Sequence, residues 1–152
     1  MARVCTARLV SCRLVLAEVL TVLALAPGAW PAGTARLTIE MFQAPGSNGV
    51  IKVSVWKGES AFLKGKPYRE AAVDMRGGKA TAVFNDMEPG DYAVSTYYDK
   101  NKNGKMDQNF VGKPTEPYGF SNDARGKFGP AKYQDARFDL VTEGRTIAIH
   151  LK

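Results

Sequence analysis

Cysteine and histidine are almost absent from this chain of 152 residues. Both cysteines, Cys5 and Cys12, lie near the start, and His150 is the only histidine. A mature chain without residues 1–35 therefore has no disulfide, no thiolate metal ligand and no cysteine nucleophile. Zinc sites usually take several His or Cys ligands, and a catalytic triad needs a base beside its nucleophile. We expect neither site. We expect His150 on the surface, because it alternates with Ile149 and Leu151.

Long apolar runs are also missing. The run from Leu14 to Ala26 has about 13 residues, whereas a helix that spans a bilayer needs roughly 20. Basic residues precede this run and the small residues Gly33, Thr34 and Ala35 follow it, which is the pattern of a cleaved export signal. We predict a signal peptide over residues 1–35, no transmembrane segment after cleavage, and a single domain over residues 36–152.

The cleavage position is open between Ala35 and, as second choice, Ala32. Glu18 interrupts the apolar run, so an uncleaved anchor and a misplaced start codon remain alternatives. With cleavage, we expect the protein to be exported to the periplasm or the cell exterior. A secreted domain without disulfides must be stabilised by its core, an ion or a partner.

The chain lacks any block of charge of one sign. The formal net charge is +6, from 21 basic and 15 acidic residues, and the signs are mixed along the chain. Cleavage would remove three Arg and one Glu, which leaves a net charge of +4. Because nucleic-acid binding requires a clustered basic patch, we expect no nucleic-acid partner.

What the chain does have is apolar residues at every second position. A period of two, with polar residues between, is typical of strands that have one wet face. The pattern predicts an all-β fold, a single antiparallel β-sandwich of about seven strands of the immunoglobulin-like or transthyretin-like kind, with a small barrel as the alternative. The predicted strands are residues 37–41, 51–55, 70–75, 81–87, 92–96, 136–140 and 147–151.

Two local signals connect these strands. The Gly77-Gly78 pair predicts a hairpin between the runs 70–75 and 81–87. Residues 59–64, after Gly58, fit one helical turn.

The segment from Asp99 to about Ala131 interrupts the series of predicted strands, because it has no clear strand or helix pattern. Structureless loops beyond roughly 12–15 residues are uncommon in compact domains and are often functional. Aromatic residues recur through this segment, and such residues usually pack. We therefore predict one long ordered loop that covers an end of the sandwich.

The start of this loop has the spacing of a calcium-binding turn. Asp99, Asn101, Asn103 and Asp107 carry closely spaced side-chain oxygens, and the glycine after Asn103 permits a sharp bend. This is the first half of a D-x-[DN]-x-[DN]-G loop. We predict a metal site from these four residues, with Lys105 contributing only its backbone carbonyl, and calcium as the candidate cofactor.

The alternative is a turn that is held by its own Asx hydrogen bonds and binds no ion. The twelfth position, counted from Asp99, is Phe110, where an EF-hand has a bidentate Glu. The remaining ligands would have to come from Asn109, a distant carboxylate such as Asp123, the backbone or water. Interleaved lysines oppose the cation, so we expect a weak Kd, on the order of 10⁻⁴–10⁻³ M.

Residues 118–126, with the sequence YGFSNDARG, have two interpretations. In the first, Tyr118 and Phe120 offer aromatic faces to a sugar or peptide, and Asn122 and Arg125 orient that ligand. In the second, Tyr118, Phe120 and Phe128 form a small core beneath the loop, and Arg125 holds nearby carbonyls or carboxylates.

Trp56 and Tyr97 pose a similar question. Each alternates out of phase with the apolar residues of its run, so each should face away from the main core. Either they form an exposed aromatic patch that binds a partner, or the long loop buries them.

The segment DYAVSTYYDKNKNGKMDQNFVGKPTEPYGFSNDARGKFGP, after an EPG turn, resembles the bacterial family called domain of unknown function 2141. The likeness runs from about Leu37 to Leu151, and the YGFSNDARG stretch is its most specific part. Members often carry His before the first Asp of the acidic loop, where this chain has Tyr98, which argues against a His ligand there.

The resemblance implies an exported β-sandwich and names no activity. The strand after the EPGDY turn is also similar to transthyretin-like and carboxypeptidase-regulatory-like modules, which are commonly non-catalytic. We expect no enzyme, but a binding or structural module of the cell envelope, with calcium as candidate stabiliser and an unidentified glycan or protein as ligand. The alternatives are an accessory or adhesion module that works through protein partners, and a carboxylate-dependent hydrolase.

Overall fold

The computed structural model describes residues 33–44 and 49–152. Residues 1–32 of the predicted signal peptide lie outside the described residues, and its last three residues, 33–35, are described. Its last residue, Ala35, is buried and begins strand β1 (Ala35–Phe42). Cleavage after Ala32, the second choice, would leave this strand whole.

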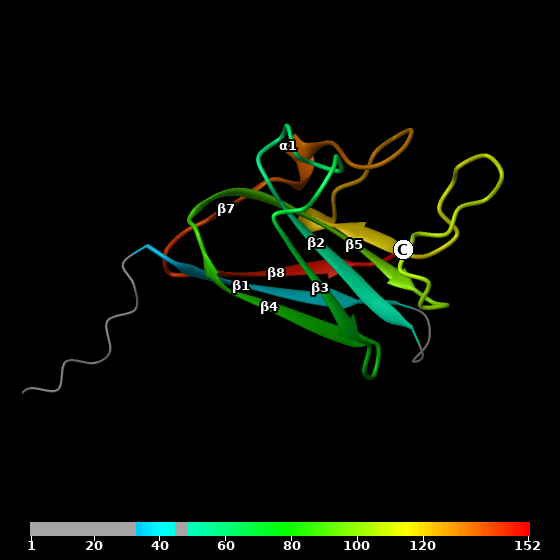
Figure 1. The fold of residues 1–152 in the computed structure, drawn as a ribbon, viewed down its shortest axis with the longest axis horizontal. Coiled ribbons are helices and arrows are strands. Elements are labelled where there is room, and N and C mark those ends of the chain that lie inside the picture. The colour runs from blue at the N-terminus through cyan, green and yellow to red at the C-terminus, as the bar shows by residue number, and fades with distance from the viewer. Residues whose placement is uncertain (1–32, 45–48) are drawn as a thin grey trace, which may run out of the picture.

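The described residues form eight strands in two sheets, drawn in Figure 1. The three-stranded sheet has the order β4-β1-β8, with β4 at Lys79–Met87 and β8 at Arg145–His150. The larger sheet has the order β3-β2-β5-β6 and comprises β3 (Arg69–Asp74), β2 (Val50–Lys57), β5 (Gly90–Asp99) and β6 (Tyr118–Phe120), with β7 (Phe138–Leu140) also paired to β5. The predicted all-β sandwich is confirmed, and each predicted strand is present.

Pairing among the described strands is antiparallel except between β1 and β8, which run parallel. The predicted hairpin at Gly77-Gly78 is wrong in its pairing. Arg76 and Lys79 do close a tight turn, but β3 joins the larger sheet and β4 the smaller one. The chain therefore crosses between the sheets at this turn.

The apolar side chains at every second position of the strands fill the space between the two sheets. On β1, for example, Leu37, Ile39 and Met41 are fully buried, while Arg36 and Glu40 are exposed. Burial of apolar surface is the main force that holds such a sandwich together. We call this cluster the main core; from β2 and β5 it includes Ile51, Val53, Val55, Tyr92, Val94 and Tyr98, and from β8 Ile147 and Ile149.

A second cluster lies on the opposite face of the larger sheet. We call it the outer cluster; its members are Trp56, Phe62, Ala93, Phe120, Ala131, Tyr133 and Ala136. Short helical turns support it: the 3-10 turn η1 (Ser121–Asp123) follows β6, and α1 (Tyr133–Ala136) precedes β7. The predicted strand 136–140 therefore begins only at Phe138, because Ala136 ends α1.

Strand β6 joins the two sheets at one edge. A Cβ atom on Gly119 would lie 2.6 Å from Cγ2 of Ile149, so only glycine allows this approach. Tyr118 and Lys152 exchange two backbone hydrogen bonds of 3.1 Å. The end of the long loop is thus held against the C-terminal end of β8.

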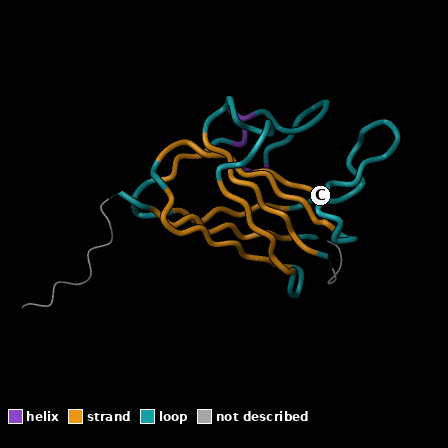
Figure 2. Tube along the Cα trace, in the orientation of Figure 1, coloured by secondary structure: helices purple, strands orange, loops and turns teal. Residues whose placement is uncertain are grey.

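The predicted long loop without a strand is interrupted: β6 and η1 lie within it, and Figure 2 shows its two parts as separate loops. We call residues 100–117 the first loop and residues 121–137 the second loop. Residues 59–64 form hydrogen-bonded turns from Phe62 N to Glu59 O and from Lys64 N to Ala61 O, not the predicted helical turn. In the described part of the chain, no helix has the length and apolar character needed to cross a membrane.

Candidate functional site

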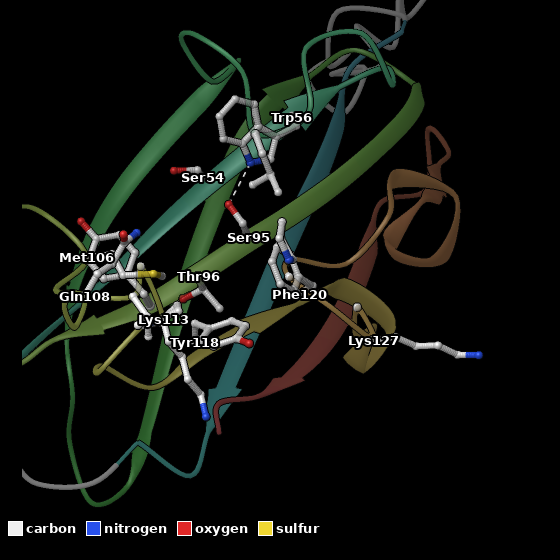
Figure 3. Close-up of a pocket in the computed structure, with 18 residues that line it drawn as sticks. Ser54, Trp56, Ser95, Thr96, Met106, Gln108, Lys113, Tyr118, Phe120 and Lys127 are labelled. Carbon is white, nitrogen blue, oxygen red and sulfur yellow. Dashed lines mark hydrogen bonds between the residues drawn. The ribbon is translucent and has the colours of Figure 1, made fainter.

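The outer face of the larger sheet contains a hollow between aromatic side chains. Strand register places Ser54 of β2 opposite Ser95 of β5, and Ser95 opposite Phe120 of β6. Two residues along β5, on the same face, Tyr97 lies opposite Tyr118. The two small serines therefore lie beside large neighbours, which leaves a cavity of about 710 Å³ (Figure 3).

The two loops form the walls of this cavity. Met106, Gln108 and residues 111–114 of the first loop line it, and Gly126, Lys127, Gly129 and Pro130 of the second loop line it as well. Leu63, from the turn after β2, completes the border. The larger sheet forms the floor of the cavity, and the two loops form its walls.

The lining combines aromatic and aliphatic surface with hydroxyl and amide groups. The indole nitrogen of Trp56 donates to Ser95 Oγ at 2.9 Å, which satisfies the indole and leaves the serine hydroxyl able to donate in turn. Lys113 and Lys127 are the charged residues among the described lining residues, and Figure 3 shows the Lys127 side chain extending away from the cavity. None of the described lining residues is an acid or a histidine.

The four predicted ligand residues separate into two pairs. Tyr118 and Phe120 line the cavity. Asn122 does not; its side-chain nitrogen donates to the backbone oxygens of Asp135 at 3.2 Å and Arg137 at 2.8 Å, which ties η1 to α1. Arg125 is exposed, does not line the cavity, and has no hydrogen bond or ion pair within the described residues. Phe120 belongs to the outer cluster, as the small-core interpretation predicts, but Phe128 is fully exposed.

Trp56 and Tyr97, which the sequence places on the outer face, are covered to different extents. Trp56 packs edge-on against Phe62 and is only 6% exposed. Tyr97 is half-buried and its hydroxyl donates to the backbone oxygen of Gly104 at 3.0 Å. Burial raises the pKa of Tyr97, and the nearby carboxylates of Asp99 and Glu116 raise it further. The second interpretation, burial, describes Trp56, whereas Tyr97 is only half-buried and lines the cavity.

The five predicted calcium ligands are gathered at the base of the first loop. Asp99 is fully buried, and its carboxylate accepts hydrogen bonds from the backbone amides of Asn103 at 3.0 Å and Gly104 at 2.8 Å. The side-chain amides of Asn101 and Asn103 each donate to Asp107 at 2.8 Å. Lys105 contributes its backbone amide, which donates to Asn103 Oδ1.

The hydrogen bonds of this turn are those of the Asx alternative. Asn109 and Asp123, which were suggested as further ligands, bond elsewhere: Asn109 Oδ1 accepts from the amides of Val111 and Lys113, and Asp123 contacts His150. No cluster of three or more His, Cys, Asp or Glu side chains that would suit a metal ion occurs in residues 33–44 and 49–152. Calcium stays a prediction.

Glu116 is a structural residue that the sequence did not indicate. It is 7% exposed, and its two carboxylate oxygens accept from the backbone amides of Lys100 at 2.8 Å and Asp107 at 3.0 Å. The two amides belong to opposite ends of the acidic turn, so Glu116 closes the first loop. No spacing rule connects Glu116 to Asp99, because the contact depends on the path of the loop back to β6.

His150 lies on the surface, as predicted, but it is paired. Its Nδ1 lies 2.7 Å from Asp123 Oδ2, its backbone amide donates to Asp123 Oδ1 at 2.8 Å, and its ring stacks on Phe42. Burial favours a higher pKa for Asp123, but the hydrogen bonds and charge of His150 outweigh it and hold that pKa below its usual value. The pair fastens η1, at the start of the second loop, to β8.

Comparison with known proteins gives a family and no activity. Neither a curated protein nor a solved structure gives a significant match. The family model described as "Uncharacterized protein conserved in bacteria (DUF2141)" matches residues 39–148, which extend from β1 to β8 and include both loops. The chain belongs to this family.

Proposed function

We infer that this protein is a non-catalytic binding module that works outside the cytoplasm and binds a short glycan in the cavity of the larger sheet. The observation that carries this proposal is the cavity itself. Its volume of about 710 Å³ falls within the roughly 300–1,000 Å³ that is typical of small-molecule sites. The export signal predicted from the sequence supports a location in the periplasm or beyond.

The chemistry of the lining favours a neutral ligand rich in hydroxyl groups. Tyr118 and Tyr97 present half-buried rings, which suit the apolar face of a sugar. Ser54, Ser95 and Gln108 add hydroxyl and amide groups, which can both donate and accept hydrogen bonds. A ligand with hydroxyl groups around an apolar face matches both parts of this surface.

The alternative of a carboxylate-dependent hydrolase has less support. Glycoside hydrolysis uses two carboxyl groups that flank the scissile bond. The described lining residues include no Asp or Glu, and the nearby carboxylates of Asp99 and Glu116 accept hydrogen bonds from backbone amides. These carboxylates are committed to loop structure, so we propose no enzymatic step.

Tryptophan fluorescence tests the proposal. The chain has two tryptophans, Trp30 and Trp56, so in a Trp30→Phe background the emission reports on Trp56 at the cavity alone. Glycans that bind this variant on an array are then titrated in solution. We expect saturable changes in emission with at least one of them, and we expect Tyr118→Ala to weaken that binding.

A cavity-filling variant provides the matched control. Ser54→Phe places a ring in the hollow, whereas Thr81→Phe places the same ring on the exposed surface of β4. We expect Ser54→Phe to abolish glycan binding with little change in melting temperature, and Thr81→Phe to leave binding intact. Equal binding by the two folded variants would contradict the proposed site, and turnover of a glycoside would contradict the non-catalytic assignment.

A further inference from the structure

Each of the two loops carries a phenylalanine that is completely exposed. Phe110 in the first loop and Phe128 in the second have exposed fractions of 100% and 102%, and Val111 beside Phe110 is 68% exposed. Other phenylalanines on this side of the sheet, Phe62 and Phe120, are buried in the outer cluster. Full exposure of two aromatic side chains is unfavourable in water and indicates an interaction surface.

The tight turns at the two tips keep these side chains outside. In the first loop, Asn109 N donates to Lys113 O and Gly112 N to Asn109 O, both at 2.9 Å, so the chain reverses directly around Phe110 and Val111. In the second loop, a Cβ atom on Gly126 would lie 2.2 Å from the oxygen of Pro130, so the base of the tip is closed as tightly. Phe128 then has no neighbouring surface to fold onto.

Both tips border the same cavity mouth. Val111, Gly112 and Lys113 line the cavity from the first loop, and Lys127 and Gly129 line it from the second. Figure 1 shows the first loop, in yellow-green, at the right end of the sandwich and the second loop, in orange, beside α1 on the upper side of the view. Phe110 and Phe128 thus belong to one surface, which we call the tip surface: residues 109–113 and 125–129.

The charge around the tip surface is positive. Lys113, Arg125 and Lys127 are exposed and lie within the tips themselves. The three acids of residues 100–131 are Asp107, Glu116 and Asp123, and each is engaged in hydrogen bonds described above. Six basic residues accompany them in the same segment: Lys100, Lys102, Lys105, Lys113, Arg125 and Lys127.

We propose that the tip surface docks on an anionic membrane, with Phe110, Val111 and Phe128 entering the headgroup region and Lys113, Arg125 and Lys127 contacting lipid phosphates. Aromatic side chains favour the membrane–water interface, and basic residues near an anionic leaflet add attraction. A second copy of the chain is the less favourable occupant, because it would bring two positively charged tip surfaces together. Val111, Lys113 and Lys127 also line the cavity, but the docking residues include neither the serines nor the tyrosines on which glycan binding is argued, so the two proposals can be tested separately.

Vesicle co-sedimentation tests the docking surface. The protein is mixed with phosphatidylcholine vesicles that contain or lack phosphatidylglycerol, in the full chain and in a chain that starts at Gly33. The eight strands of the described residues and both clusters lie within the shorter chain, which removes the apolar run of residues 14–26 from the assay. We expect both chains to bind the anionic vesicles and to release them as the salt concentration rises.

Substitutions at the tips then separate the two contributions. Phe110→Ala combined with Phe128→Ala should weaken binding to anionic vesicles by about tenfold or more, which corresponds to about 1.4 kcal/mol. Lys113→Gln and Lys127→Gln should each weaken it by about fivefold, the factor for about 1 kcal/mol per basic residue near such a surface. Val83→Ala combined with Val141→Ala removes two half-exposed valines elsewhere and should leave binding unchanged.

Three outcomes would overturn the proposal. The first is that the chain starting at Gly33 fails to bind anionic vesicles at low salt. The second is that the double phenylalanine variant, shown by its melting temperature to be folded, binds as well as the parent chain. The third is a dimer in light scattering that the same variant dissolves, which would assign the tip surface to a second copy. We expect the Ser54→Phe variant to lose glycan binding and to keep vesicle binding, so the two proposals fail separately.

Discussion

The first and second loops present similar tips but are anchored by different chemistry. The first loop is held by carboxylates: Asp99 and Glu116 each accept two backbone hydrogen bonds at its base. The second loop is held mainly by packing, since Ala131 and Tyr133 belong to the outer cluster with Phe120 of β6, and hydrogen bonds of Asn122 and Asp123 add to this at η1. One polar and one apolar anchor therefore produce the same display of an exposed phenylalanine above the cavity. Because the two anchors use different residues, substitutions can disrupt each anchor separately.

The largest effect is expected at the apolar anchor. Phe62 contacts Trp56, Phe120 and Tyr133 through its ring, so Phe62→Ala removes the centre of the outer cluster. We expect the free energy of unfolding to fall by about 3–5 kcal/mol, the usual cost of such a truncation, measured by denaturant titration. The adjacent Leu63→Ala, at an exposed side chain, is the control and should change it by less than about 0.5 kcal/mol. Equal effects would show that the outer cluster does not anchor the second loop.

The second largest loss of stability is expected from a substitution in the polar anchor of the first loop. Glu116→Gln replaces one acceptor oxygen by a donor, so either the Lys100 or the Asp107 amide loses its partner. We expect a loss of about 1–3 kcal/mol, together with faster amide hydrogen exchange in the first loop than in the second. Glu143→Gln, at an exposed turn, is the control. Faster exchange in both loops equally would mean that the two anchors are not separate.

Calcium would act on the polar anchor alone. If the turn at Asp99 binds calcium with the weak affinity expected from the sequence, 10 mM ion exceeds a Kd of 10⁻⁴–10⁻³ M by about 10–100-fold and should stabilise the fold by about 1.4–2.7 kcal/mol. The measurement is a thermal melt with calcium and then with chelator, with magnesium as control. An unchanged midpoint would rule out a site of this affinity and leave the Asx turn as the full description.

A smaller, pH-dependent effect is expected where the second loop meets β8. The pKa of Asp123 is lowered in the folded protein, so its contribution to stability is present above its unfolded pKa of about 3.9 and is lost as pH falls through the lower folded value. Both partners are about two-fifths exposed, and exposed pairs contribute no more than about 1 kcal/mol. We expect Asp123→Asn to be less stable than the parent at pH 6 and nearly equal to it at pH 2 in urea titrations. A constant difference across this range would contradict the assignment.

The smallest effect should come from Tyr133 in the apolar anchor. Its hydroxyl is buried and has no hydrogen-bond partner within the described residues, and burial raises its pKa. Tyr133→Phe keeps the ring and removes an unsatisfied polar group, so we expect the free energy of unfolding to stay equal or rise by up to about 1 kcal/mol. Phe62→Tyr adds a hydroxyl within the same cluster and serves as the control. A clear loss of stability in Tyr133→Phe would reveal a partner for the hydroxyl.

The sequence predicted the sandwich well because one physical rule sufficed. Leu37, Ile39 and Met41 alternate with polar residues, and a strand with one buried face has no other way to place them. The same rule placed His150 on the surface and Trp56 on the outer face. It failed at Gly77-Gly78, where a turn that favours a hairpin instead carries the chain from one sheet to the other. Local turn chemistry does not specify which sheet the next strand joins.

The site was predicted only in part. Tyr118 and Phe120 were identified as candidate ligand residues and do line the cavity, whereas Asn122 and Arg125 do not. Asn122 bonds to backbone oxygens of α1, an element that no periodicity indicated. The hollow depends on Ser54 lying opposite Ser95, and strand register between distant segments is not encoded by either segment alone.

By itself, the sequence determined the fold class, the family, the order of strands along the chain and the acidic turn at Asp99, because these follow from local spacing and residue type. The tertiary structure alone decided that Glu116 closes the first loop, that Asp123 pairs with His150, and that both loops line one cavity, each with an exposed phenylalanine. These features join residues from separate segments, and such contacts arise only once the sheets have packed.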